Sequence, residues 1–135
     1  MTALDAKGFE QEVQRIISND SKGKLLEGHK NYKLHLPFPI PASDFWSIIV
    51  YDSLTHLIIH NDQPWPSVYS TKADLVSNND GSVDVWFGPD EIEGKKGNWV
   101  KTIPGKRWYM LLRLYYPLES WFNKKWRPGE IEEIA

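Results

Sequence analysis

The sequence predicts an all-β protein, an antiparallel β-sandwich of jelly-roll-like type, with an N-terminal amphipathic α-helix and a short late helix. Three observations support this prediction. Short apolar stretches alternate with turns rich in Gly and Pro, a spacing typical of strands. Residues 108–116, WYMLLRLYY, contain no Gly, Pro or acidic residue and read as a central strand. No helical segment separates successive strand-like stretches, so parallel pairing is not expected.

The stretch from Trp108 to Tyr116 is apolar on both faces apart from one arginine. Successive side chains of a strand point to opposite faces, so both faces would be covered if the strand lay in the middle of a sheet. An interior cation needs a carboxylate or several carbonyl groups as partners. We therefore expect Arg113 near Tyr51, Asp52 or Tyr115, either as a structural ion pair or as a group that holds an anionic ligand.

The bulk composition sets limits on the partners of the chain. It has 135 residues, a formal net charge of −2 and no Cys, which fits one domain without disulfides or thiolate metal sites. The charge gives no reason to expect nucleic acid or an anionic membrane surface. The N-terminus has no apolar signal region and no stretch approaches the roughly 20 apolar residues that span a bilayer. The expected location is cytoplasmic, without membrane association.

The expected elements begin with an amphipathic helix over residues 2–18. Phe9, Val13 and Ile16 recur at helical spacing and form one apolar stripe. This stripe could pack on the sheet or join two copies of the chain into a homo-oligomer. Residues 1–28 would then be a helix with its connector, and residues 29–135 the β-sandwich domain.

The rest of the chain reads as strands joined by turns. The expected strands are 32–38, 45–51, 55–60, 73–77, 82–88 and the central strand. Residues 45–51 and 55–60 are expected to form a hairpin, as are 73–77 and 82–88 around an Asp-Gly turn. Within 82–88, Val83, Val85 and Phe87 would face one way, and Asp84 and Trp86 the other. A short helix is expected over 117–126, opened by Pro117, with a polar tail after it.

Seven Trp and six Tyr are many for a chain of this length. Filling a small core is one use for them, because aromatic side chains bury the most area per residue. A ligand surface or a protein interface is the other. Trp65 stands between two prolines that hold it in an extended conformation. A binding surface would be concave and aromatic around Trp65, Trp86 and Trp99.

Six motifs occur in an order that is similar to a known family: FWSIIVYD, NDQPWPS, NNDGSVDVWFGP, GNWVKTIPGK, LLRLYYPLESWF and WRPG. With these motifs, residues 30–135 resemble the domain-of-unknown-function 1214 family. The resemblance implies a jelly-roll-like β-sandwich. Members are often the second half of longer bacterial proteins, frequently exported, behind a companion domain of unknown function. The resemblance implies no activity for any residue.

Two classes of function remain open. The first is a non-catalytic module that binds a small molecule, a glycan or a protein partner through an aromatic-rich surface. The second is a hydrolase-like or isomerase-like enzyme in which Asp52, His56 and Arg113 converge. His56 and His60 would stand about 13 Å apart on a strand, too far for one ion, so we predict no metal site and no cofactor. The candidate ligand-binding residues are Tyr51, Asp52, Trp65, Trp86, Trp99 and Arg113.

Overall fold

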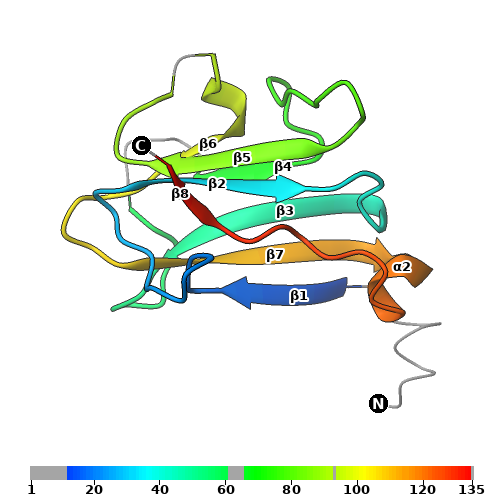
Figure 1. Cartoon of the computed structure of the whole chain (residues 1–135), viewed down its shortest axis with the longest axis horizontal. Coiled ribbons are helices and arrows are strands. Elements are labelled where there is room, and N and C mark those ends of the chain that lie inside the picture. Colours follow the sequence, from blue (N-terminus) through cyan, green and yellow to red (C-terminus); the bar gives the residue numbers. More distant parts are fainter. Residues whose placement is uncertain (1–11, 61–65, 93, 135) are drawn as a thin grey trace.

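The structure, a computed structural model, describes residues 12–60, 66–92 and 94–134. The strands within these residues form two four-stranded sheets, which Figure 1 shows as stacked ribbons that run in similar directions. The strand order is β1-β7-β3-β4 in the first sheet and β6-β5-β2-β8 in the second. The fold is therefore mostly β, as predicted.

The first sheet consists of β1 (Glu12–Ile17), β7 (Trp108–Pro117), β3 (Ala42–Asp52) and β4 (Ser67–Tyr69). The second consists of β6 (Trp99–Lys101), β5 (Val83–Gly88), β2 (Asn31–Leu36) and β8 (Glu132–Ile134). The helical segments are a 3-10 turn, η1 (Lys96–Asn98), and a short helix, α2 (Glu119–Phe122).

Inner-face side chains of both sheets meet in one hydrophobic cluster. The strand β7 lies between β1 and β3, which confirms its central place in the first sheet. Its inner-face residues Trp108, Met110, Leu112 and Leu114 are each at most 1% exposed. Each such side chain contributes about 1.5–3 kcal/mol by leaving water. The outer face of β7, around Arg113, is only partly covered within the described part of the chain.

Residues 12–17 form the edge strand β1 and not the end of a helix. The strand pairs antiparallel with β7, from Glu12 opposite Tyr115 to Ile17 opposite Met110. The helix predicted over 2–18 is therefore wrong for residues 12–17, and residues 2–11 lie outside the described residues. A spacing of four residues keeps Val13 and Ile17 on one face of a helix and also on one face of a strand. The strand forms because pairing with β7 satisfies the backbone N–H and C=O groups along the edge of β7 that does not pair with β3.

The first predicted hairpin forms only in part, and the second does not form. Residues 55–60 make no strand, but they return antiparallel to the end of β3 through the bridge between Tyr51 and Ile58, with backbone hydrogen bonds from Asp52 N to Leu57 O and from Ile59 N to Val50 O. The strand partners of β3 are β7 and β4. Residues 73–77 form no strand. The Asp-Gly turn after them is present as predicted, with Gly81 at φ +88°, and it leads into β5. The turn could be predicted from the sequence because it depends on neighbouring residues. The partner of a strand could not, because it depends on the whole sheet.

The sheets are not wholly antiparallel, because β5 and β6 pair in parallel. The connection over residues 89–98 is shorter than parallel pairs usually have, and its described residues include one 3-10 turn and no α-helix. The late helix is also shorter than predicted: α2 covers only Glu119–Phe122, after Pro117 has ended β7. Among the described residues, no helix combines the length and apolar character needed to cross a bilayer.

Candidate functional site

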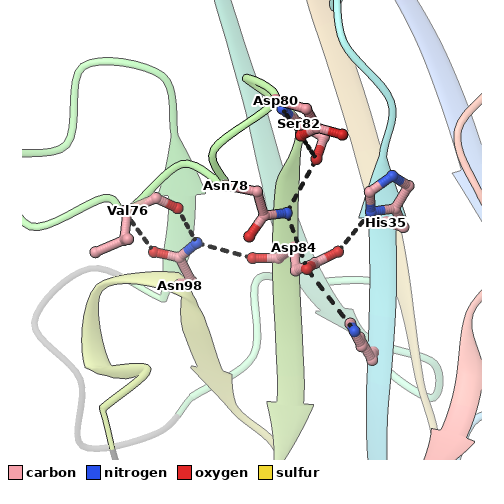
Figure 2. Close-up of polar contacts among 8 residues, drawn as sticks. His35, Val76, Asn78, Asp80, Ser82, Asp84 and Asn98 are labelled. Atoms are coloured by element: carbon pink, nitrogen blue, oxygen red, sulfur yellow. Dashed lines mark hydrogen bonds and ion pairs between the residues drawn. The ribbon is translucent and has the colours of Figure 1, made fainter.

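A polar network centred on Asp84 occupies the outer face of the second sheet. Asp84 alternates with the buried Val83 and Val85 on β5, so its side chain points away from the core. His35 stands opposite on β2, and its Nδ1 lies 2.6 Å from Asp84 Oδ1. Asn78 Nδ2 donates to Asp84 Oδ2 at 3.0 Å, as Figure 2 shows. The carboxylate therefore joins two strands and the turn that precedes β5.

The charge of this network is set by its contacts. Burial alone would raise the pKa of the Asp84 carboxyl, but hydrogen bonds from His35 and Asn78 outweigh it and hold the pKa below its usual value. The positive charge of Lys33, with Nζ 3.7 Å from Asp84 Oδ2, also lowers the pKa of Asp84. The His35 ring is 47% exposed and uses Nδ1 for Asp84. Its second ring nitrogen is therefore available for a bound molecule.

Asn98 supports the network from behind. Its side chain is 3% exposed, donates to the carbonyl oxygens of Val76 and Asp84 at 2.8 Å each, and accepts from Val76 N at 2.9 Å. Figure 2 shows this amide between the two backbone segments. One side chain thus satisfies backbone groups around Val76 that a strand ladder would otherwise pair. The amide thus links Val76 to Asp84 of β5, although residues 73–77 form no strand.

Two of the predicted tryptophans lie side by side next to this network. Trp86 follows Asp84 on the same face of β5, and Trp99 of β6 is its partner in register. Trp86 is partly exposed, with Lys95 Nζ 4.8 Å and Lys33 Nζ 5.7 Å from its ring centre. Trp99 is 8% exposed and donates from Nε1 to the carbonyl oxygen of Gly88. Trp86 is thus the accessible ring, and Trp65 lies outside the described residues.

Asp52 lines a separate cleft of about 640 Å³ at one end of the sheets, together with Glu27, Gly28, His29, Ser53, Leu54, Gly105, Lys106 and Arg107. Asp52 accepts hydrogen bonds from the backbone N–H of Leu54 at 2.8 Å and from Lys106 Nζ at 3.3 Å. The Leu54 hydrogen bond, more than the lysine, holds the pKa of Asp52 below its usual value. The carboxylate is thus occupied in closing a turn.

Asp52, His56 and Arg113 do not converge. Asp52 is level with Trp108 on β7, whereas Arg113 is level with Ser47, five positions along β3 or about 16 Å away. The odd number of positions also puts the two side chains on opposite faces of the sheet.

Each of the other two groups has its own contacts. Arg113 Nε donates to Glu12 Oε2 at 2.5 Å, and Arg113 lies 5.6 Å from the Tyr115 ring. His56 lies against Tyr109, whose ring stacks on that of Tyr51. No cluster of three or more metal-binding side chains occurs within the described ranges.

A further pocket, of about 330 Å³, was missed by the sequence reasoning. Its lining residues are Arg15, Trp121, Phe122, Lys124, Trp126 and Arg127. Five of the six belong to the run WFNKKWR after β7, in which aromatic and basic residues are interleaved. The high proportion of aromatic and basic residues in this run was the sequence feature that could have indicated a binding pocket. The contribution of Arg15 could not be foreseen, because residues 2–18 were predicted to be helical.

Comparison with known proteins gives a family and a fold. The family model described as "Protein of unknown function (DUF1214)" matches residues 11–119. The VPA0106 protein from Vibrio parahaemolyticus is similar in structure, with 22% identity and a TM-score of 0.79 over 93% of this chain. An uncharacterized protein from Burkholderia cenocepacia has 15% identity and a TM-score of 0.55 over 95% of the chain. The chain spans 31% of each of these two. No curated protein matches it.

Proposed function

The chain belongs to the DUF1214 family, and from this premise we propose that it is a non-catalytic binding module for a small polar molecule or a glycan. The ligand would lie on the outer face of the second sheet, around Trp86. The observation that supports this most is the adjacency of Trp86 and Asp84 on one strand face, with His35 and Asn78 bonded to the carboxylate. A flat apolar ring thus stands beside a group of hydrogen-bonding side chains.

The chemistry of a sugar matches this combination. A saccharide ring has an apolar C–H face and a rim of hydroxyl groups, so it takes both an aromatic surface and polar partners. The Trp86 ring offers the first. The carboxylate of Asp84, the amide of Asn78 and the free ring nitrogen of His35 offer acceptors and donors for the second. Because Asn98 holds the backbone beneath them, these groups are positioned before a ligand arrives.

The two lysines near Trp86 do not block the site. Lys95 is exposed, and Lys33 has 41% of its side chain exposed, so each contact with the ring is a surface contact. A cation–π contact at an exposed site contributes only about 0.5–1 kcal/mol. A ligand that displaced one ammonium group would lose little. A ligand with an acidic group would instead gain from both charges.

We also infer that the two sheets form the jelly-roll-like sandwich expected of the family. The support is the single cluster built from both inner faces, including Trp108 and Leu112 from the first sheet and Leu34 and Val85 from the second. A two-layer body of this kind leaves the outer faces of both sheets free for a ligand or a neighbouring domain.

Titration followed by NMR tests the proposal. The probes are glucose, galactose, mannose, N-acetylglucosamine and glucuronate, added to about 10 mM, because weak small-ligand binding falls in the millimolar range. We expect at least one sugar to shift the Trp86 indole N–H signal in a saturable way. In Trp86→Ala, which lacks that indole, the backbone N–H signals of Asp84 and Asn78 should no longer respond to the sugar, and in Asp84→Asn binding should weaken at least severalfold.

The control is Tyr116→Ala, which removes an exposed aromatic ring at the end of β7, in the first sheet. This variant should bind as the unchanged protein does. Circular dichroism would establish that each variant is folded. Absence of saturable binding by every probe, or equal binding by Trp86→Ala, would refute the proposed site.

A further inference from the structure

A second pocket lies between the edge strand β1 and the segment that follows α2. Its volume is about 330 Å³, near the lower end of the range for small-molecule sites. Trp121, Phe122 and Trp126 supply its aromatic lining, and Arg15, Lys124 and Arg127 supply three positive charges. None of the described residues that line it is acidic. Figure 1 shows α2 at the end of the molecule where β7 finishes and β1 begins.

The aromatic floor of the pocket is held in place by hydrogen bonds. Trp126 is 6% exposed, donates from Nε1 to the carbonyl oxygen of Pro37 at 2.8 Å, and donates from its backbone N–H to Ser120 O at 3.0 Å. Trp121 packs against the core and lies 6.4 Å from Trp126, ring centre to ring centre. Gly129 N donates to His35 O at 2.7 Å, which ties the segment to β2. The rings are therefore preorganised.

The three cations are not neutralised within the described part of the chain. No carboxylate there lies within salt-bridge distance of Arg15, Lys124 or Arg127, and all three are exposed. By contrast, Arg113 on the neighbouring strand is paired with Glu12. Lys124 also has φ of +61°, a conformation that a long side chain rarely adopts. Three like charges around one hollow repel one another, and an anion would relieve that repulsion.

We infer that this pocket is a second ligand site, for a small organic anion with a flat apolar body, such as an aromatic carboxylate. The flat body would lie against the partly exposed rings of Trp121 and Phe122, and the carboxylate would face Arg15 and Arg127. Arginine pairs with carboxylates in a two-point geometry and also stacks on aromatic rings, so it suits both halves of such a ligand. The site shares no lining residue with the surface around Trp86 and does not rest on its function.

The volume and the lining select among anions. A single benzene ring suits a cavity of about 150 Å³, so a hollow of about 330 Å³ has room for a molecule with two rings. A bare anion such as acetate would leave the aromatic side chains of the pocket in contact with water. A neutral ring of the same shape buries the same area but leaves three cations without a counter-charge. Binding should therefore require both the flat body and the negative charge.

The test uses the whole chain and four probes: benzoate and indole-3-acetate as flat anions, benzamide as the neutral analogue, and acetate as the anion without a ring. Indole N–H signals of Trp121 and Trp126 in NMR spectra would report binding, with isothermal titration for affinity. We expect saturable binding of at least one flat anion, and binding at least tenfold weaker for benzamide and acetate.

Variants locate the site. Arg15→Gln and Arg127→Gln should each weaken binding of the flat anion about tenfold, the usual effect of losing one charged hydrogen bond. Lys124→Gln should weaken it by less, because a lysine is a point charge without the planar fork. The matched control is Lys125→Gln. This variant also removes one lysine charge, but the Lys125 side chain does not line the pocket.

Each outcome decides for or against the inference. Selective binding of flat anions that falls in the arginine variants, but not in Lys125→Gln, supports it. Equal binding of benzamide and benzoate, unchanged affinity in both arginine variants, or no saturable shift with any probe up to about 10 mM would overturn it. All substituted cations are exposed, so the variants should stay folded, which circular dichroism would verify.

Discussion

Glu12 and Arg113 form an ion pair across the first sheet, with Arg113 Nε 2.5 Å from Glu12 Oε2. Glu12 is two positions from the residue opposite Arg113, so the pair runs diagonally between β1 and β7 on the outer face. Each side chain is about a quarter exposed. The arginine of the central strand thus finds the carboxylate that its position demands, from a segment whose strand structure was not foreseen.

Loss of this pair should loosen the edge strand. We expect Glu12→Gln to lower the free energy of unfolding by about 1 kcal/mol, because the contact is charged but partly exposed to water. A double-mutant cycle with Arg113→Gln, measured by urea denaturation, should give a coupling energy of similar size that shrinks at high salt. The same cycle between Glu12→Gln and Arg15→Gln should show no coupling. Additive effects of Glu12→Gln and Arg113→Gln would contradict the pairing.

Stability should fall in acid through carboxylates whose pKa is low in the folded state. The hydrogen bond from Arg113 lowers the pKa of Glu12, and that from Leu54 N lowers the pKa of Asp52. A lowered folded pKa means stability that is present above the unfolded pKa, about 4, and is lost as the pH falls through the folded value.

The free energy of unfolding should therefore decrease below about pH 4. In Asp52→Asn the decrease should be smaller, and stability at pH 7 should be lower. Urea titrations between pH 7 and pH 3 would measure both effects. An Asp52→Asn profile that runs parallel to that of the unchanged protein would show that this carboxylate has no such role.

Gly28 should tolerate no side chain. A Cβ there would lie 1.8 Å from the carbonyl oxygen of Ile103 and 2.8 Å from that of Lys106, both of them backbone atoms that cannot move alone. Gly28→Ala should therefore cost about 3 kcal/mol or more in chemical denaturation, or prevent folding. Gly94→Ala is the control, because Gly94 has φ of +78° but open space around it, and should cost only about 1 kcal/mol. Similar losses in the two variants would contradict the close approach at Gly28.

Asn98 should matter for both stability and ligand binding. Asn98→Ala would remove the hydrogen bonds that its amide makes with partly buried backbone groups of Val76 and Asp84, at a cost of about 1–2 kcal/mol. Because the amide also holds the strand that bears Asp84, the same variant should weaken any ligand at Trp86 beyond what its stability loss explains. Asn19→Ala, an exposed amide, should cost less than about 0.5 kcal/mol. Unchanged stability of Asn98→Ala would show that water replaces the amide.

The alternation within individual strands was readable from the sequence. In residues 82–88 it correctly put Val83 and Val85 on the buried face and Asp84 and Trp86 on the other. It also identified β2, β3 and β7 as strands, and for β7 it predicted a cationic side chain that needs a carboxylate. These features depend on neighbours one or two residues apart, which the sequence states directly.

The candidate sites were only partly readable for the opposite reason. Asp52 and Arg113 were grouped because they are both polar residues near apolar strands, yet the register of β3 and β7 holds them about 16 Å apart. The pocket around Trp121 was not predicted, because one of its lining residues, Arg15, is distant in the sequence from the others. No local pattern records which strand a given strand will pair with.

The sequence by itself determined an all-β body, its central strand and the face on which each side chain of that strand lies, since a period of two is a property of the local backbone. Only the tertiary structure decided that residues 12–17 are a strand, that β5 and β6 run parallel, and that Arg15 and Trp121 line one pocket. Those outcomes follow from satisfying open strand edges and burying apolar faces across the whole chain, which couples residues that are far apart in sequence.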